Sequence, residues 1–390
     1  RMDTHLKIKG ILTEEQKMLQ ENARKFALNE MLPTIREYEE QRKVNLELTK
    51  KLGELGMLGI HIPEQYGGAG YDYTAAALVW EQLSYVSWSQ TLTALGHSVL
   101  AATIFYLGAS EEQKQKYLPP LCRGDTIIAV GAVEPAAGSD AGAIETKAEL
   151  VGDEWVINGT KNFISHGGIA DTVLVLCQTD KSLGWKGIAL IAVDTDTPGF
   201  SSHPISMIGD QAGDLCTLSF VDCRVPKENL INKVGRGLNV TLHGIDSARL
   251  FIAAGALGMT QCCLDASIKF AKERWQFGKP IGSFQMIQDT IATMAAELMA
   301  VRWQVYYAAD LKSKNLPHAK ELSAAKMLAS DLAVRAAEQA IRVHGAYGCT
   351  DDYPVARHYR DSILTTILGG TREMHKLTIG RELLGLNARS

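Results

Sequence analysis

The sequence lacks the patterns that mark several large classes of protein. Its seven cysteines are scattered and never form C-x-x-C, so they predict no metal site and no disulfide framework. Such usage suits a reducing compartment, and we expect a bacterial cytoplasm or an organelle matrix. No run of 18 apolar residues is present, so we expect no membrane span. A formal charge of −4 without a basic run argues against nucleic acid as a partner.

The chain does contain enough residues, 390, for two or three domains around a large core. Helical spacing of apolar residues runs from about residue 12 to residue 118. Short β-rich runs begin at residue 126, and helical spacing returns after residue 226. We therefore predict an α+β fold: an N-terminal α-helical domain over residues 1–125, a central antiparallel β domain over residues 126–238, and a C-terminal four-helix bundle over residues 239–390.

Local signals refine the limits of these elements. Thr13 is the predicted N-cap of the first helix, and the pair Pro119-Pro120 predicts the end of the last N-terminal helix. The β-rich runs follow one another without intervening helices, which favours an antiparallel barrel or sandwich over a dinucleotide-binding fold. Long apolar periodicities over residues 252–272, 286–314 and 319–344 predict helices that pack side by side.

A pair of glycines interrupts the helical pattern near the end of the chain. An apolar run over residues 363–368 stops at Gly369-Gly370, and helical spacing resumes after Thr371. Glycine lets a backbone approach a ligand closely, and the first N–H groups of the next helix can donate to an oxygen or an anion. Taken alone, the pair is better explained as a helix C-cap followed by a new helix. Stretches upstream change this interpretation.

Four stretches carry a resemblance when they are taken together. They are residues 134–140 (EPAAGSD), residues 158–165 (NGTKNFIS), residues 273–278 (ERWQFG) with Phe284-Gln285, and residues 344–348 (HGAYG) leading to Gly369-Gly370-Thr371. In this order and spacing the chain resembles the acyl-CoA dehydrogenase flavoproteins over essentially its whole length. Through the features described below it also resembles dehydrogenases of cyclic alkenoyl-CoA, such as cyclohexene-carboxyl-CoA.

The resemblance implies an FAD cofactor, an acyl-CoA substrate, an electron-transfer flavoprotein as electron acceptor, and a homotetramer of paired dimers. The FAD would lie between the β domain and the bundle, with its ADP half reaching a neighbouring subunit. The implied FAD contacts are Val133, Ser139, Phe163, Ser165, Arg274, Phe277, Gln285, Arg342, Gly345, Ala346, Thr371 and Glu373. The implied substrate contacts are Ser139, Asp246, Arg249 and Gly370.

Several of these positions depart from the family pattern. Phe163 stands where a Trp is usual against the flavin ring, and Ser165 replaces a Thr at the polar edge of the ring. Val133 stands where a Ser or Thr is usual, so one side-chain hydrogen bond to the flavin is lost. Arg342 and Ala346 replace a Gln and a Gly, which changes details of the contacts. An aromatic face and an arginine fork still suit a flat ring and a pyrophosphate.

The largest departure concerns the catalytic base. The family removes the acyl α-proton with a carboxylate, while preorganised donors polarise the thioester carbonyl. The usual carboxylate position is Gly369 here, whose backbone N–H remains as a carbonyl donor, and the second known position is Ala248. In the cyclic alkenoyl-CoA dehydrogenases, a more remote proton is lost to an acid on a pocket helix. The position that aligns with this acid is Thr91.

Three explanations stay open. The chain is a dehydrogenase that uses another base or another proton, for instance in a vinylogous 1,4-elimination from a cyclic or unsaturated acyl-CoA. Alternatively, it is a variant from which the base was removed. The third explanation is that the chain is a flavin-binding relative with a different function. It could catalyse another reaction, such as that of an enoyl-CoA reductase or oxidase, or it could be a non-catalytic homologue. His97 could accept a proton, although a buried and hydrogen-bonded histidine is the favoured interpretation; Asp246 and Glu373 are favoured as structural residues.

Overall fold

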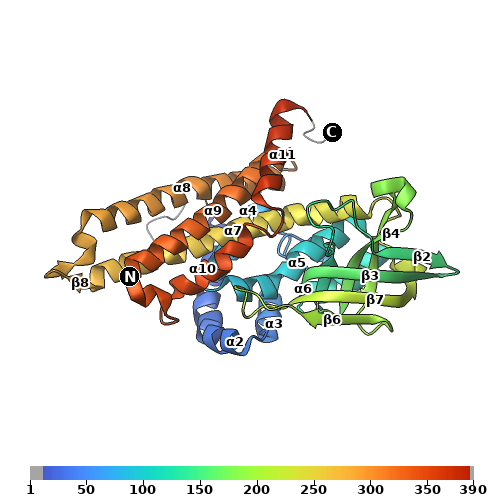
Figure 1. Ribbon diagram of the computed structural model, residues 1–390, viewed down its shortest axis with the longest axis horizontal. Helices are drawn as coiled ribbons and strands as arrows, with labels where there is room; N and C mark the ends of the chain where they lie inside the picture. Colours follow the sequence, from blue (N-terminus) through green and yellow to red (C-terminus); the bar gives the residue numbers. More distant parts are fainter. Residues whose placement is uncertain (1–11, 387–390) are drawn as a thin grey trace.

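The protein runs from helices to a sheet and back to helices along residues 12–386, which the computed structural model describes (Figure 1). The predicted fold class, with a helical, a β and a second helical part in this order, is confirmed. The division of the chain at residues 125 and 238 stays a prediction. The second of these limits falls inside α7 (Gly237–Glu273).

The N-terminal part is helical, and its first helix starts where the sequence predicts. The side chain of Thr13 accepts a hydrogen bond from the backbone N–H of Gln16, and the Gln16 side chain caps Thr13 in return. The longer helices of this part are α1 (Glu14–Phe26), α2 (Ile35–Gln41), α3 (Leu46–Glu54), α4 (Tyr73–Ser84), α5 (Trp88–Gly108) and α6 (Glu111–Cys122).

The helix α6 does not end at its prolines. It continues through Pro119 and Pro120 to Cys122, so the prediction of a helix end at the proline pair is wrong. Leu121 and Cys122 are buried in the core that α6 shares with the sheet. This burial holds the last turn in helical form although each proline removes a backbone donor.

Two helices within residues 12–386, α5 and α7, are long and apolar enough to cross a membrane by length and composition. Their apolar windows are mostly buried inside the protein, to 72% in α5 and 83% in α7. Core helices of this length have the same composition, because both sides of the helix meet other elements.

The central part is a single seven-stranded sheet. Its strands are β1 (Ile128–Gly131), β2 (Lys147–Val151), β3 (Glu154–Ser165), β4 (Thr172–Gln178), β5 (Ile188–Asp194), β6 (Phe200–Pro204) and β7 (Leu215–Pro226). The order is β1-β4-β2-β3-β7-β6, and β5 pairs with β4. Most neighbours are antiparallel, but β4 runs parallel to β1 and to β2. The expectation of a wholly antiparallel sheet is wrong in this detail, because the β2–β3 hairpin is inserted in the chain between β1 and β4.

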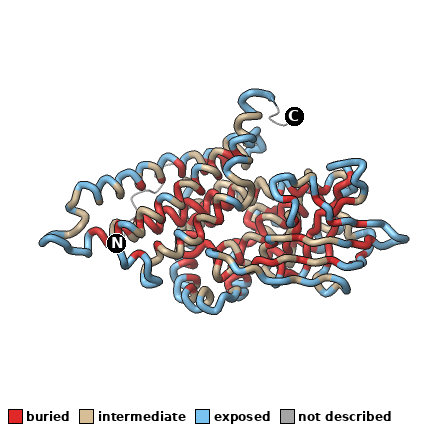
Figure 2. The backbone as a smooth tube through the Cα atoms, viewed as in Figure 1, coloured by how far each residue is buried: buried red, intermediate tan, exposed pale blue. Residues whose placement is uncertain are grey.

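The C-terminal part is a bundle of α7, α8 (Gln285–Ser313), α9 (Ala319–His344) and α10 (Pro354–Thr365), with α11 (Arg372–Leu384) against α9. The helix α7 begins well before residue 252, because its first turns pack against α5 and β5. Trp80 of α4 and Trp88 of α5 both contact Phe251 of α7, with ring centroids 5.5 and 5.4 Å apart. The N-terminal helices and the bundle therefore share one core, and buried residues line their facing sides (Figure 2).

Candidate active site

A bulge in β3 turns an aromatic ring outward. The register between β3 and β7 shifts between Lys161 and Ile164, and within this shift Phe163 has a φ of 57°. Its side chain is 58% exposed, although a ring of this size normally packs away from water. The strained backbone and the exposed ring of Phe163 together indicate a surface on which a flat ring of a ligand could stack. Ser165, half-buried, follows two residues later on the same strand.

The loop that carries Val133 is tied to this bulge. The carbonyl of Val133 accepts a hydrogen bond from the Asn162 N–H at 2.9 Å, which places Val133 beside Phe163 and Ser165. These three predicted flavin contacts are thus brought together on one side of the sheet. Ser139 lies further along the same loop and is exposed. The roles of these residues toward a flavin stay predictions.

A buried ion pair holds this loop, and the sequence reasoning gave it no role. The carboxylate of Glu134 accepts hydrogen bonds from the N–H groups of Glu145 and Thr146 and from Lys161 Nζ, the last at 2.7 Å. Burial raises the pKa of Glu134, but the hydrogen bonds from Lys161 and Thr146 outweigh it and hold this pKa below its ordinary value. No apolar pattern marked this pair in the sequence, because Thr160 and Asn162 flank Lys161 and Glu134 lies beyond the end of β1. Removing one partner would leave the other buried and unpaired.

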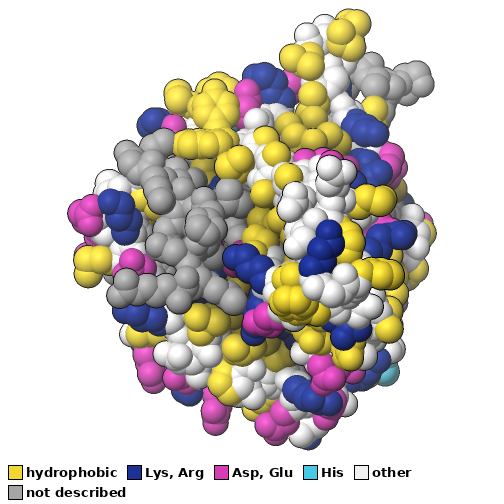
Figure 3. Space-filling model, turned by 90° about the vertical axis from the view of Figure 1, so that its left-hand side faces the viewer, with side chains coloured by type: hydrophobic (Ala, Val, Ile, Leu, Met, Phe, Trp, Pro, Cys, Tyr) yellow, Lys and Arg dark blue, Asp and Glu magenta, His cyan; other side chains and the backbone are white. Residues whose placement is uncertain are grey.

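A second group of expected FAD contacts lies at the far end of the bundle, whereas Thr371 and Glu373 lie at the start of α11. Phe277 lies in the hairpin of β8 (Trp275–Gln276) and β9 (Lys279–Pro280), with a φ of 52° and 93% of its side chain exposed. The guanidinium of Arg274 lies over the ring of Tyr347, 5.6 Å from its centroid, so the hairpin meets the turn after α9. Hydrophobic and basic side chains lie next to each other on this end of the molecule (Figure 3).

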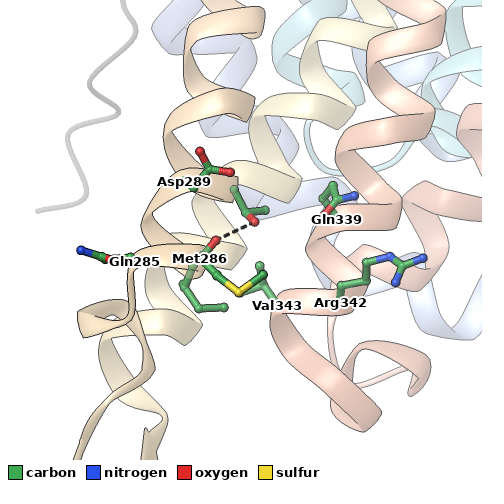
Figure 4. A pocket seen from close by; sticks show the side chains of 8 residues that line it. Gln285, Met286, Asp289, Gln339, Arg342 and Val343 are labelled. Carbon is green, nitrogen blue, oxygen red and sulfur yellow. Dashed lines mark hydrogen bonds between the residues drawn. The ribbon is translucent and has the colours of Figure 1, made fainter.

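A hollow of about 410 Å³ lies between the start of α8 and the end of α9. Met286 and Val343 face each other across it (Figure 4). The lining residues include two predicted FAD contacts, Gln285 and Arg342, and are Gln285, Met286, Ile287, Asp289, Thr290, Gln339, Arg342 and Val343. Gly345 follows with a φ of 61° and open space where a side chain would begin. The guanidinium of Arg342 pairs with Glu338 on the same helix, at 2.7 Å from Nη2 to Oε1, so a phosphate would have to compete with this carboxylate for it.

The two groups of predicted contacts lie far apart within one chain. The hairpin of β8 and β9 is at one end of the bundle, and the sheet with Phe163 is at the other end of the molecule (Figure 1). One chain alone therefore does not bring Phe277 to Phe163. The large exposed rings in both groups fit a cofactor that is covered by two copies of the chain.

The Gly369-Gly370 pair forms the turn between α10 and α11, with φ values of 68° and 109°. Arg249 of α7 donates from Nε to the carbonyl of Gly369, and Lys326 of α9 donates from Nζ to the carbonyl of Gly370, each at 2.8 Å. Arg249 also pairs with Asp246, at 2.8 Å from Nη1 to Oδ1. The predicted substrate residues Asp246, Arg249 and Gly370 are thus in one place, next to Gly369.

The helix that follows begins beside the same turn. The Thr371 hydroxyl is its N-cap and lies 3.5 Å from the Met374 N–H that it accepts from. Glu373 is exposed in the first turn of α11, where its negative charge favours the helix N-terminus. Ala248 is half-buried on α7 between Asp246 and Arg249.

Two expected proton-transfer residues lie on α5. The hydroxyl of Thr91 is fully buried and donates to the carbonyl of Ser87 at 2.6 Å, so its proton is used within the helix. His97 is also buried, as expected, but neither of its ring nitrogens has a hydrogen bond of ordinary geometry. Its ring lies 5.6 Å from that of His166. Burial, and then the charge of His166, lowers the pKa of His97 to about 3.

Sequence reasoning missed two residues beneath the Gly369-Gly370 turn, Lys326 and His375. Both are 1% exposed. The signal for Lys326 was a charge among apolar residues at helical spacing, with Leu322 and Ala329 on the same face of α9. No comparable signal marked His375.

The comparisons with known proteins agree with this geometry. The acyl-CoA dehydrogenase N-terminal domain matches residues 13–125, the middle domain matches residues 129–223, and the C-terminal domain matches residues 235–384. The short-chain specific acyl-CoA dehydrogenase of Clostridium acetobutylicum is 39% identical over 373 residues, which cover 95% of this chain and 98% of that protein.

Two further matches bear on the reaction. The acryloyl-CoA reductase (NADH) of Anaerotignum propionicum is 39% identical and covers 96% of this chain and 95% of that protein. A chain solved in work on the electron transferring flavoprotein of Acidaminococcus fermentans is 40% identical, with a TM-score of 0.93 over 96% of this chain and 98% of that one.

Proposed function

This chain belongs to the acyl-CoA dehydrogenase family, and from this we propose that it oxidises an acyl-CoA thioester with an atypical acid–base arrangement. Members of the family are FAD-dependent oxidoreductases, and FAD is the cofactor of this protein. The observation that carries the proposal is the Gly369-Gly370 turn. It keeps a backbone donor for the thioester carbonyl, and no carboxylate is present at residue 369 or residue 248.

The exposed ring of Phe163 and the hydroxyl of Ser165 would hold the flavin ring, and Arg274, Phe277 and Gln285 would hold the ADP half across a subunit contact. When bound, FAD supplies a hydride acceptor. The separation of the two groups in one chain supports a homotetramer in which two copies complete each cofactor site. Light scattering during gel filtration tests this proposal: a tetramer with flavin absorbance supports it, and a monomer that holds flavin at full occupancy contradicts it.

The substrate side of the site is built from Arg249, Asp246 and the turn. The N–H of Gly369 would polarise the thioester carbonyl, which makes the α-proton acidic. Arg249 fixes the turn by its bond to the Gly369 carbonyl, so this donor is preorganised. A general base normally contributes about 10²–10⁴-fold to such a step. Unless another side chain of the site accepts the α-proton, we therefore expect slow oxidation of a saturated linear acyl-CoA and faster oxidation where another proton is lost, as in a cyclic or unsaturated acyl-CoA.

The second candidate function is reduction of an enoyl-CoA on the same fold. It is supported by the 39% identity to a protein named acryloyl-CoA reductase. An electron-transfer flavoprotein is the proposed electron partner in either direction, because a matched chain comes from work on such a flavoprotein.

An anaerobic flavin-reduction assay separates these functions. Bleaching by a cyclic or unsaturated acyl-CoA supports the dehydrogenase, whereas reoxidation of the reduced flavin by an enoyl-CoA, without bleaching by any acyl-CoA, supports the reductase. A yellow protein that responds to neither supports a non-catalytic role or a variant without its base. Adding an electron-transfer flavoprotein to the same cuvette, and measuring its reduction, tests whether it accepts electrons from this protein.

A further inference from the structure

An imidazole without partners lies directly behind the Gly369-Gly370 turn. His375 stands in the first turns of α11 and is 1% exposed, and neither ring nitrogen has a hydrogen bond of ordinary geometry. A side chain on Gly370 would begin 3.4 Å from His375 Nε2 and 3.6 Å from Arg249 Nη2, both ordinary contact distances. A carbon atom therefore fits at this place, in contact with Nε2.

The other polar side chains at the turn are engaged with partners, although burial, and then the charge of Arg249, lowers the pKa of Lys326 to about 7. Arg249 is permanently charged, and its donors are used by the Gly369 carbonyl and by Asp246. Lys326 donates to the Gly370 carbonyl. The carboxylate of Asp246 is held in its ion pair with Arg249. His375 is the side chain at this turn whose ring nitrogens have no hydrogen bond of ordinary geometry.

We propose that His375 is the catalytic base that accepts the acyl α-proton in place of a carboxylate at residue 369. This inference rests on the proposed oxidation of an acyl-CoA. In the step, the α C–H bond breaks and its proton bonds to His375 Nε2. The electron pair left on the α-carbon forms the new double bond to the β-carbon as the β-hydrogen leaves as a hydride, for which FAD held by Phe163 and Ser165 would supply the acceptor. The acyl group loses two electrons in this way, and the imidazole ends as imidazolium.

The surroundings set the strength of this base. Burial, and then the charges of Lys326 and Arg249, lowers the pKa of His375 to about 4, against a smaller upward effect of the Gly370 backbone. An ordinary glutamate has a pKa of about 4.3. His375 therefore has the proton affinity of the carboxylate that it replaces and is neutral at physiological pH. The guanidinium of Arg249, one of the two groups that lower its pKa, also favours the negative charge that develops on the thioester.

The test uses the FAD-loaded enzyme and an acyl-CoA analogue in which sulfur replaces the β-carbon. This probe can lose its α-proton but cannot transfer a hydride, so uptake of deuterium from D₂O at the α-carbon reports the base alone. We expect exchange in the wild type and a loss of about 10²–10⁴-fold in His375→Gln. His358→Gln is the matched control, because His358 is equally buried and without partners but lies on α10; its exchange should be unchanged.

Two further variants separate a base from a residue that only supports the fold. Lys326→Gln removes a charge that lowers the pKa of His375, so the pH at which exchange is lost in acid should move upward. The double variant His375→Gln with Ala248→Glu should regain exchange, because a carboxylate returns at the family's second position.

The outcomes are distinct. Unchanged exchange in His375→Gln, or no exchange in a wild type that binds the probe, overturns His375 as the base. A wild type that binds neither flavin nor probe, judged from the flavin spectrum, overturns the proposed function itself.

Discussion

In a His375→Gln background, installing a glutamate at either of the two positions that the resemblance assigns to the family's base should restore oxidation of a saturated linear acyl-CoA. The perturbations are Ala248→Glu and Gly369→Glu. Each would place a carboxylate beside the α-proton, and the expected gain in kcat is about 10²–10⁴-fold. The two substitutions differ in what they do to the fold.

The structure predicts that Ala248→Glu is the better tolerated of the two. Ala248 is half-buried in the long helix α7, where exchange of Ala for Glu costs less than about 0.7 kcal/mol in helix propensity. Gly369 has a φ of 68°, and its Cβ would lie 2.9 Å from Cδ1 of Ile252. The left-handed backbone and the crowding together cost about 2–5 kcal/mol in free energy of unfolding.

Stopped-flow reduction of the flavin by a saturated linear acyl-CoA measures the gain, and urea unfolding measures the cost. Ala248→Gln is the matched control, since it has the size of Glu without the charge. The reasoning is refuted if Ala248→Gln reacts as fast as Ala248→Glu, because a carboxylate would then not be the missing group. It is also refuted if His375→Gln alone already reacts at the rate of the double variant His375→Gln with Ala248→Glu.

Three other substitutions test separate parts of the structure. Arg274→Ala should weaken FAD retention in dialysis more than Lys314→Ala, because Lys314 only pairs with Asp310 at the surface; equal retention would contradict the assigned site. Val133→Thr should restore a hydrogen bond to the flavin and so shift the absorption spectrum or the redox potential of the flavin. If both the spectrum and the potential are unchanged, Val133 does not contact the flavin. Burial raises the pKa of Glu39 to about 7 from 4.5, so stability is full below about pH 4.5 and falls as pH rises through 7. Glu39→Gln should flatten this dependence, by at most about 3 kcal/mol of unfolding free energy, in urea titrations over that pH range.

Much of the fold follows from local pattern. Apolar residues three and four apart predict α9 with its observed limits at Ala319 and His344, because one face of that helix is buried along its whole length. The N-cap at Thr13 is likewise a local property, since the hydroxyl and the N–H that it accepts from are three residues apart. The order of motifs was enough to identify the family.

The sheet and the ends of some elements depended on neighbours that are distant in sequence. The parallel pairing of β1 with β4 joins segments that are separated by a hairpin, and no turn signal encodes it. The last turn of α6 survives its two prolines because Leu121 and Cys122 are buried by other elements. The spacing of apolar residues and the turn residues each describe one segment of the chain at a time. They therefore predict neither the pairing of β1 with β4 nor the last turn of α6.

The sequence by itself determined that residue 369, the position that the resemblance assigns to the family's carboxylate, is a glycine. The tertiary structure alone decided what surrounds this turn. Arg249 reaches the Gly369 carbonyl across 120 residues of chain, and Lys326 reaches the Gly370 carbonyl across 44. His375 is close in sequence, but its burial arises from the packing of α11 against α9. Electrostatics at a site depends on distances in space, and these are set only when the helices pack.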